Sequence, residues 1–270
     1  MDDIEIESGS LKARSVGVGQ PVLLIHGAFA PDIFGPMIKN ERLAAYRFVE
    51  YRRRGHIDSA ANVEGESLAD YARDALAVVD HYGLEQVDVV GHSYGGRIAL
   101  EVARLAPSRV HTLIVLEPGA PPDLEVPDTS VRNGFVESAA AYKAGMRSEA
   151  LDIALAGVGG PSSRVDLSAV LRDGWYDQAV EDLGVLFNHE LPAQWGLRMS
   201  DLAAMGMPSC VVQGEHSKAF FAQVCAAVAE ELPDCQTVTA PGATHWLPAG
   251  WPDAVAPVLA DFLDQHPLPD

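Results

Sequence analysis

Apolar and polar positions along the first half of the chain predict strands and helices in turn. Short apolar runs at Pro21–Ile25, Val87–Val90 and Thr112–Leu116 are typical of strands buried on both faces of a sheet. Apolar residues recur at helical spacing from Leu68 to Tyr82 and from Gly95 to Ala106. The order strand, helix, strand, helix, strand requires a mostly parallel sheet with right-handed crossovers. Weaker strand signals lie nearer the N-terminus, where Ile4–Ser8 and Lys12–Val16 predict a hairpin across Gly9-Ser10.

After residue 118 the strand pattern stops. Residues 119–206 contain no strand-like run, and Pro- and Gly-rich joints separate three predicted helices, Val131–Lys143, Ser148–Leu155 and Gln178–Asn188. Strand and helix signals alternate again from Pro208 onwards. We therefore predict an α/β fold, with a mostly parallel, doubly wound sheet from residues 1–118 and 207–270 and a helical cap from residues 119–206.

Composition restricts the classes of function. The chain has 38 Asp and Glu against 19 Lys and Arg, a formal net charge of −19. This balance repels phosphate backbones and anionic lipid, so neither nucleic acid nor a membrane is an expected partner. The N-terminus is acidic where a signal peptide would be basic, and no apolar run is long enough to span a bilayer. Three cysteines, Cys210, Cys225 and Cys235, lack metal-type spacing and favour a reducing compartment. We expect a cytoplasmic monomer or homodimer that acts on a small molecule without metal or other cofactor.

The segment Gly91-His92-Ser93-Tyr94-Gly95 matches the pattern Gly-x-Ser-x-Gly. It begins where an apolar strand ends, and a helix follows immediately, which is the strand–turn–helix context of a nucleophilic serine. A serine hydroxyl is a weak nucleophile near neutral pH and requires a base. Of nine histidines, His245 follows the last predicted strand and precedes the last helix, so its loop can reach the carboxyl ends of the strands. Ser93 and His245 are the predicted nucleophile and base.

With Ser93 and His245 in these contexts, the chain resembles the α/β-hydrolase superfamily, in particular its lid-bearing esterase, lactonase and peroxidase-like members. His26-Gly27 resembles the oxyanion turn, and Arg53–Ser59 resembles the family's Arg-Gly-x-Gly-x-Ser loop, with Ile57 in place of the second glycine. Ser93, Pro208–Glu215 and the Gly-x-x-His motif at 242–245 follow in family order. The resemblance implies that the backbone N–H groups of Ala28 and Tyr94 form an oxyanion hole, with Phe29 as the alternative to Ala28.

The triad acid departs from the family pattern. Family members usually carry Asp in the turn after the strand at 208–213, and this chain has Ser217 there. Either the acid is lost, or it has moved to Glu117 at the carboxyl end of the strand after the nucleophile helix, where certain dehalogenases and a mycotoxin lactonase carry theirs. A charged residue that ends an apolar strand also needs a partner. We favour Glu117, with Glu215 and Asp123 as alternatives.

Aromatic residues suggest the walls of a substrate pocket suited to an apolar or aromatic acyl group. They are Phe29, Trp175, Tyr176, Phe187, Trp195 and Trp246. The expected function is a serine hydrolase of carboxylic esters or lactones. Three alternatives remain open: a C–C bond hydrolase acting on a diketone-like substrate, a non-hydrolytic ligand-binding or cyclase-like protein, and a perhydrolase side activity.

Overall fold

The computed structural model describes residues 1–60 and 67–269. Within them, eight strands form one sheet in the order β1-β2-β4-β3-β5-β6-β7-β8. Strand β2 pairs antiparallel with β1 and β4, and the other neighbouring pairs are parallel. The strands are β1 (Asp2–Ile6), β2 (Gly9–Gly17), β3 (Gln20–Ile25), β4 (Tyr46–Arg52), β5 (Val87–His92), β6 (Val110–Leu116), β7 (Ser209–Gly214) and β8 (Cys235–Ala240).

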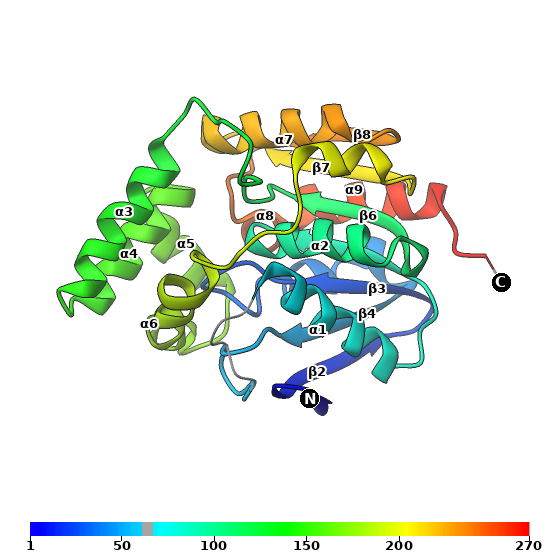
Figure 1. Cartoon of the computed structure of the whole chain (residues 1–270), viewed down its shortest axis with the longest axis horizontal. Coiled ribbons are helices and arrows are strands. Elements are labelled where there is room, and N and C mark those ends of the chain that lie inside the picture. The colour runs from blue at the N-terminus through cyan, green and yellow to red at the C-terminus, as the bar shows by residue number, and fades with distance from the viewer. Residues whose placement is uncertain (61–66, 270) are drawn as a thin grey trace.

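Helices cover both faces of the sheet (Figure 1). Helices α1 and α2 pack against each other on one face, and α9 lies on the opposite face. The helices outside the cap are α1 (Leu68–His81), α2 (Tyr94–Leu105), α7 (Ala219–Glu231), α8 (Leu247–Gly250) and α9 (Pro252–Gln265). This doubly wound arrangement confirms the predicted fold class.

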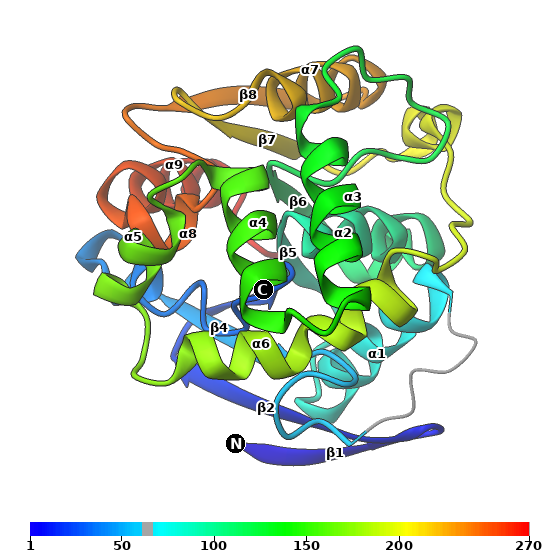
Figure 2. The same cartoon turned by 90° about the vertical axis from the view of Figure 1, so that its left-hand side faces the viewer.

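A group of helices between β6 and β7 lies together beside the sheet in Figure 1 and faces the viewer in Figure 2. We call this segment the cap; it contains α3 (Ser130–Lys143), α4 (Arg147–Gly159), α5 (Ser163–Val170) and α6 (Trp175–Val185). A π-helical turn, Leu186–Glu190, continues directly from α6. Inside the cap, α3 and α4 form the most extensive contact.

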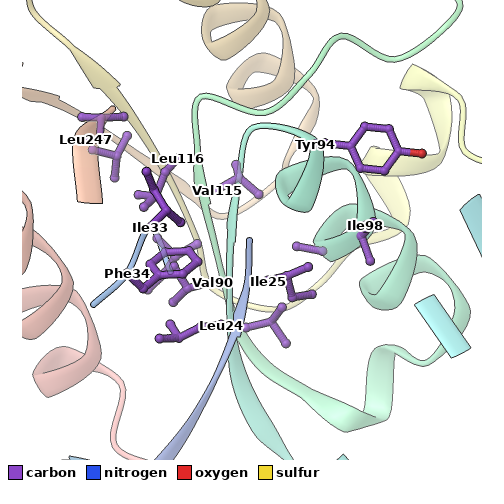
Figure 3. Packing of buried hydrophobic residues seen from close by; sticks show 14 of the residues in the cluster. Leu24, Ile25, Ile33, Phe34, Val90, Tyr94, Ile98, Val115, Leu116 and Leu247 are labelled. Atoms are coloured by element: carbon purple, nitrogen blue, oxygen red, sulfur yellow. The ribbon is translucent and has the colours of Figure 1, made fainter. Parts of the chain in front are cut away.

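The core lies between the central strands and the helices on either side (Figure 3). Leu24, Val90 and Val115 come from three adjacent strands, and each is fully or almost fully buried. Ile98 of α2 belongs to the same buried cluster. The central strands are buried on both faces, which is why each appears in the sequence as a continuous apolar run.

Two local predictions differ from the structure. The first hairpin turns at Glu7-Ser8, because Ile6 pairs with Gly9, and not across Gly9-Ser10. Helix α5 was not predicted, since its eight residues contain only two buried positions and give a weak helical pattern. Among the described residues, no helix is long and apolar enough to cross a membrane. Cys210, Cys225 and Cys235 carry free thiols, the first two buried.

Candidate active site

Ser93 lies at the sharp turn between β5 and α2. Its backbone has φ 53° and ψ −118°, a conformation that non-glycine residues rarely adopt. The turn is possible because neighbouring positions lack side chains. A Cβ on Gly95 would lie 2.0 Å from the carbonyl oxygen of Ile25, and a Cβ on Gly27 would lie 3.0 Å from Cβ of Ser93. The glycines therefore let β3, β5 and α2 approach closely and present the Ser93 hydroxyl at the end of the sheet.

His245 lies in the loop after β8 and faces Ser93. Its Nε2 atom is 3.0 Å from Oγ of Ser93. The ring stacks on Phe221 of α7, with 3.9 Å between centroids and an interplanar angle of 15°. Nε2 of His92 donates to the His245 carbonyl oxygen at 2.8 Å. Burial, with a smaller contribution from His245, lowers the pKa of His92 to about 3, so His92 is a neutral support for the loop.

Glu117 follows β6 and holds the other side of the imidazole. Its Oε2 atom is 2.7 Å from Nδ1 of His245, and its Oε1 atom accepts the backbone N–H of Gly214 at 2.7 Å. The side chain is fully buried, and the residue has a positive φ of 45°. Both carboxylate oxygens therefore have partners, as a buried charge requires. Ser93, His245 and Glu117 form one continuous hydrogen-bonded chain.

The other acids considered from the sequence lie elsewhere. Glu215 is exposed and accepts the N–H of Gly242. Asp123 is exposed and accepts the N–H of Met199. The hydroxyl of Ser217 is buried and has no hydrogen-bond partner among the described residues. Of the carboxylates in the described part of the chain, Glu117 is therefore the one that contacts His245.

The turn after β3 lies beside the serine. Nδ1 of His26 donates to the carbonyl oxygen of Gly27 at 2.8 Å, while Nε2 accepts the backbone N–H of Arg53 at 3.1 Å. Burial, followed by the charge of Arg53, lowers the pKa of His26 well below its ordinary range, which keeps the ring neutral in this role. Phe29 has a φ of 71°, so the chain turns sharply after Ala28.

A cavity of about 470 Å³ opens at Ser93 and His245. The residues proposed as oxyanion donors, Ala28 and Tyr94, line it. Its apolar walls come from both core and cap, and include Phe29, Phe220, Phe221, Val131, Phe135, Val158, Leu186 and Trp246. The charged side chains among its described lining residues are those of Arg97 and Arg132, and no carboxylate is among them. An apolar cavity with few polar groups is typical of a small-molecule site.

The structure corrects four of the six predicted pocket aromatics. Phe29 and Trp246 line the cavity, but Trp175, Tyr176, Phe187 and Trp195 do not. Three of them pack within the cap: the indole of Trp175 donates to Ser168, the hydroxyl of Tyr176 donates to Asp152, and Phe187 packs on Tyr142. The ring of Trp195 lies against the guanidinium of Arg97, with 3.6 Å from Cζ to the ring centroid. These aromatic residues stabilise the cap and its junction with α2.

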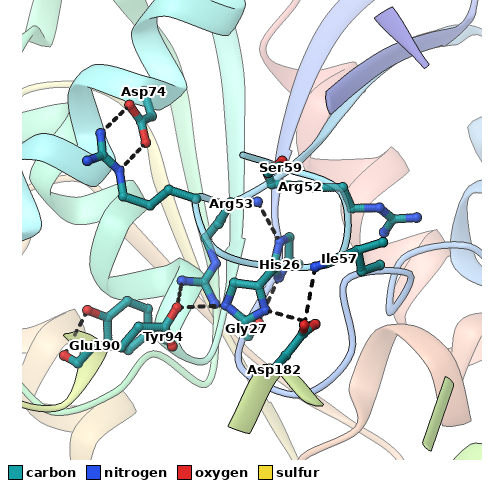
Figure 4. A network of polar contacts seen from close by, with 12 residues as sticks. His26, Gly27, Arg52, Arg53, Ile57, Ser59, Asp74, Tyr94, Asp182 and Glu190 are labelled. Atoms are coloured by element: carbon teal, nitrogen blue, oxygen red, sulfur yellow. Dashed lines mark hydrogen bonds and ion pairs between the residues drawn. The ribbon is translucent and has the colours of Figure 1, made fainter. Parts of the chain in front are cut away.

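Figure 4 shows a buried polar network behind the oxyanion turn. Arg53 forms an ion pair with Glu190, and both side chains are fully buried. Nε2 of His56 donates to Glu190 at 2.8 Å, and Nδ1 of His56 lies 3.5 Å from Asp182. Burial and Arg53 act to lower the pKa of His56, but Glu190 and Asp182 raise it above its ordinary value. Ile57, in place of the family's glycine, keeps a positive φ of 49° in this loop.

Sequence reasoning missed Phe221 and Glu190. Phe221 lies on α7, in an apolar helix whose sequence does not reveal which side chain faces the base. Glu190 is 137 residues from Arg53 along the chain, and no spacing rule pairs them.

A serine on a strained turn, an imidazole and a buried carboxylate at the carboxyl ends of a parallel sheet define a hydrolase of the α/β type. The family model described as alpha/beta hydrolase fold matches residues 20–249, and the chain belongs to this family. A non-heme haloperoxidase of Rhodococcus erythropolis is 37% identical over 121 residues, 44% of this chain and 43% of that protein. The chain thus matches less than half the length of this relative.

Solved structures show the same fold over almost the whole chain. An alpha/beta hydrolase from Sphaerobacter thermophilus has a TM-score of 0.77 and 24% identity, covering 97% of this chain and 100% of that one. A thermophilic esterase from Thermogutta terrifontis has a TM-score of 0.73 and 21% identity, covering 98% and 99%. These likenesses show the fold.

Proposed function

We propose that this chain is a serine hydrolase that cleaves a carboxylic ester or lactone of an apolar or aromatic small molecule through an acyl-enzyme. The observation that carries the proposal is the chain of contacts from Ser93 through His245 to Glu117, which opens into a largely apolar cavity. The esterase from Thermogutta terrifontis, which shares the fold, supports this choice of reaction class.

The geometry supports the following first half of the reaction. Nε2 of His245 takes the proton of Ser93 as Oγ attacks the substrate carbonyl carbon, and the carbonyl oxygen becomes an oxyanion. The N–H groups of Ala28 and Tyr94 donate to that oxyanion, and Tyr94, as the first residue of α2, has an N–H at the free N-terminus of a helix. The intermediate collapses, and the leaving alkoxide receives the proton from His245. For a lactone, this alcohol stays attached to the acyl group.

In the second half, a water molecule attacks the acyl carbon and gives its proton to Nε2 of His245. The second tetrahedral intermediate releases the acid and returns the proton to Ser93. Glu117 orients the imidazole through Nδ1 and stabilises the imidazolium in both halves. The buried position of Glu117 keeps this interaction out of bulk solvent, where it would be weaker.

Labelling with a fluorophosphonate probe, followed by peptide mass spectrometry, tests the proposal. We expect one label, on Ser93, that disappears in Ser93→Ala and in His245→Ala. His81→Ala, at the exposed end of α1, serves as the histidine control and is expected to label like the natural chain. A well-folded natural chain that takes no label would refute the proposal. Release of two carbon fragments without an alcohol from a diketone substrate would instead assign the site to C–C bond hydrolysis.

A further inference from the structure

Two donors hold the carbonyl oxygen of Gly27. Nη2 of Arg53 donates to it at 3.0 Å, and Nδ1 of His26 donates at 2.8 Å (Figure 4). A trans peptide is planar, so the N–H of Ala28 points away from the carbonyl of Gly27. Fixing this carbonyl therefore fixes the direction of the Ala28 N–H, beside Ser93. Hydrogen bonds to a carbonyl also polarise its peptide and strengthen the N–H as a donor.

The second partner of Arg53 comes from the cap. Glu190, the last residue of the π-helical turn, pairs with Arg53 and accepts from His56. Burial alone would raise the pKa of Glu190, but Arg53 and His56 together lower it to about 2. Glu190 is thus ionised and compensates the buried charge of Arg53. Without this carboxylate, the fully buried guanidinium would lack its charge partner.

Glu190 also contacts the residue that carries the other proposed oxyanion donor. The hydroxyl of Tyr94 donates to the backbone carbonyl oxygen of Glu190 at 3.0 Å. The guanidinium of Arg53 lies over the same ring, with 5.0 Å from Cζ to the centroid. Leu186, the first residue of this turn, and Leu191, directly after it, line the cavity. One turn of the cap therefore reaches both halves of the oxyanion hole.

We infer that Arg53 and Glu190 are positioning residues for the oxyanion hole, and that docking of the π-helical turn Leu186–Glu190 sets the direction of the Ala28 N–H. The inference rests on the proposed function, because it assigns these residues to the stabilisation of that reaction's oxyanion. It couples the cap, which helps to form the substrate cavity, to the atoms that stabilise the transition state. If this turn moves away from Arg53, the N–H of Ala28 is no longer held in the direction that the oxyanion requires.

The same loop offers a matched control. Arg54, next in sequence, pairs with Asp74 of α1 through two hydrogen bonds of 2.6 Å, and this pair is also buried. Asp74 is hydrogen-bonded to Arg54 and belongs to a helix outside the cap. Asp74→Asn and Glu190→Gln thus weaken neighbouring buried pairs by the same chemical change. A purely structural role predicts parallel effects on catalysis, whereas a positioning role predicts different ones.

The experiment compares Glu190→Gln, Asp74→Asn and the double variant Arg53→Met/Glu190→Leu with the natural chain. The double variant removes both buried charges together, which proteins tolerate better than the loss of one. The probes are p-nitrophenyl butyrate for turnover and phenyl trifluoromethyl ketone, whose hemiketal with Ser93 places an oxyanion in the hole. All assays run at a temperature where circular dichroism shows every variant folded.

Loss of a whole oxyanion donor lowers kcat by about 10²–10³. For a misdirected donor we expect kcat to fall about tenfold in Glu190→Gln and about a hundredfold in the double variant. KM should stay within about threefold, and the affinity for the ketone should fall by the same factor as kcat. Asp74→Asn should retain kcat and ketone affinity. Arg53→Lys, which keeps the cation, should lie between the natural chain and the double variant.

Equal losses in Asp74→Asn and Glu190→Gln, or unchanged ketone affinity in the double variant, would overturn the inference. Either result leaves the proposed function standing as long as the natural chain is labelled at Ser93. A natural chain that neither takes the fluorophosphonate label nor hydrolyses the ester would remove both the function and the inference.

Discussion

The backbone N–H of Gly214 donates to Oε1 of Glu117 at 2.7 Å, so the end of strand β7 holds the carboxylate that strand β6 supplies. By family resemblance, the turn after β7 is where the acid usually stands. In this chain that turn contributes an amide and a serine, and the acid comes from the neighbouring strand. The imidazole atom it contacts is Nδ1 of His245, the one a triad acid requires.

Replacing Glu117 by Gln tests the assignment of the acid. The amide keeps the size of the side chain but cannot stabilise the imidazolium by charge, so we expect kcat to fall by about 10²–10⁴. Stopped-flow and steady-state hydrolysis of p-nitrophenyl butyrate measure the loss. Glu215→Gln changes the exposed carboxylate two residues before Ser217 and should retain activity. Near-full activity in Glu117→Gln, together with loss in Glu215→Gln, would assign the acid to Glu215.

Moving the acid back to the turn after β7 is a second test. The hydroxyl of Ser217 is buried without a hydrogen-bond partner in the described part of the chain. A Cβ on Gly214 would lie 2.7 Å from this hydroxyl, so Ser217 packs beside the residue whose amide holds Glu117. In a Glu117→Gln background, Ser217→Asp should restore activity at least about tenfold. Ser217→Asn in that background is the uncharged control, and equal activity of the two double variants would count against a shared acid position.

The sequence was sufficient to predict the strand ends and the residues attached to them. Ser93, Glu117 and His245 each follow an apolar strand, and parallel strands bring their carboxyl ends to one edge. The cap could not be read in this way. Packing decides which face of each cap helix meets the core. The sequence therefore identified Trp175 and Tyr176 as aromatic residues of the cap, but not that they lie outside the lining of the cavity.

Buried neutral histidines predict how stability depends on pH. Burial first, then His245, lowers the pKa of His92 to about 3, and the pKa of His26 is lowered as well. Below about pH 6.5 the unfolded chain therefore binds protons at these sites that the folded chain does not. The free energy of unfolding should fall with decreasing pH, by about 1.4 kcal/mol per pH unit for each such histidine.

Urea unfolding followed by tryptophan fluorescence at several values between pH 6 and 4.5 measures this slope. His92→Gln keeps a donor for the carbonyl of His245 and removes one of the two groups. Its slope should be smaller than that of the natural chain by about 1.4 kcal/mol per pH unit. Parallel slopes would mean that His92 is not held neutral in the folded state.

The close approach at Gly95 predicts the most damaging glycine substitution in the elbow. A Cβ at this position would lie 2.0 Å from the carbonyl oxygen of Ile25 and 2.5 Å from that of His26. Both atoms are backbone at the end of β3, so no side-chain rotation relieves the clash. Gly95→Ala must displace α2 from the sheet, and we expect it to lower the free energy of unfolding by about 3 kcal/mol or more.

Alanine substitutions at two other glycines serve as comparisons for Gly95→Ala. At Gly96 the nearest atoms to a Cβ are those of Pro118 at 2.9 Å, so Gly96→Ala should cost less than Gly95→Ala. At Gly206 no atom lies within 4 Å, and Gly206→Ala should change stability by less than about 1 kcal/mol, in the stabilising direction. Urea unfolding gives the order, and the rate of fluorophosphonate labelling reports the elbow itself. Because Ser93 precedes Gly95 by two residues, labelling should be slowest in Gly95→Ala, faster in Gly96→Ala and fastest in Gly206→Ala. A Gly95→Ala protein as stable and as reactive as Gly206→Ala would show that α2 does not approach β3 this closely.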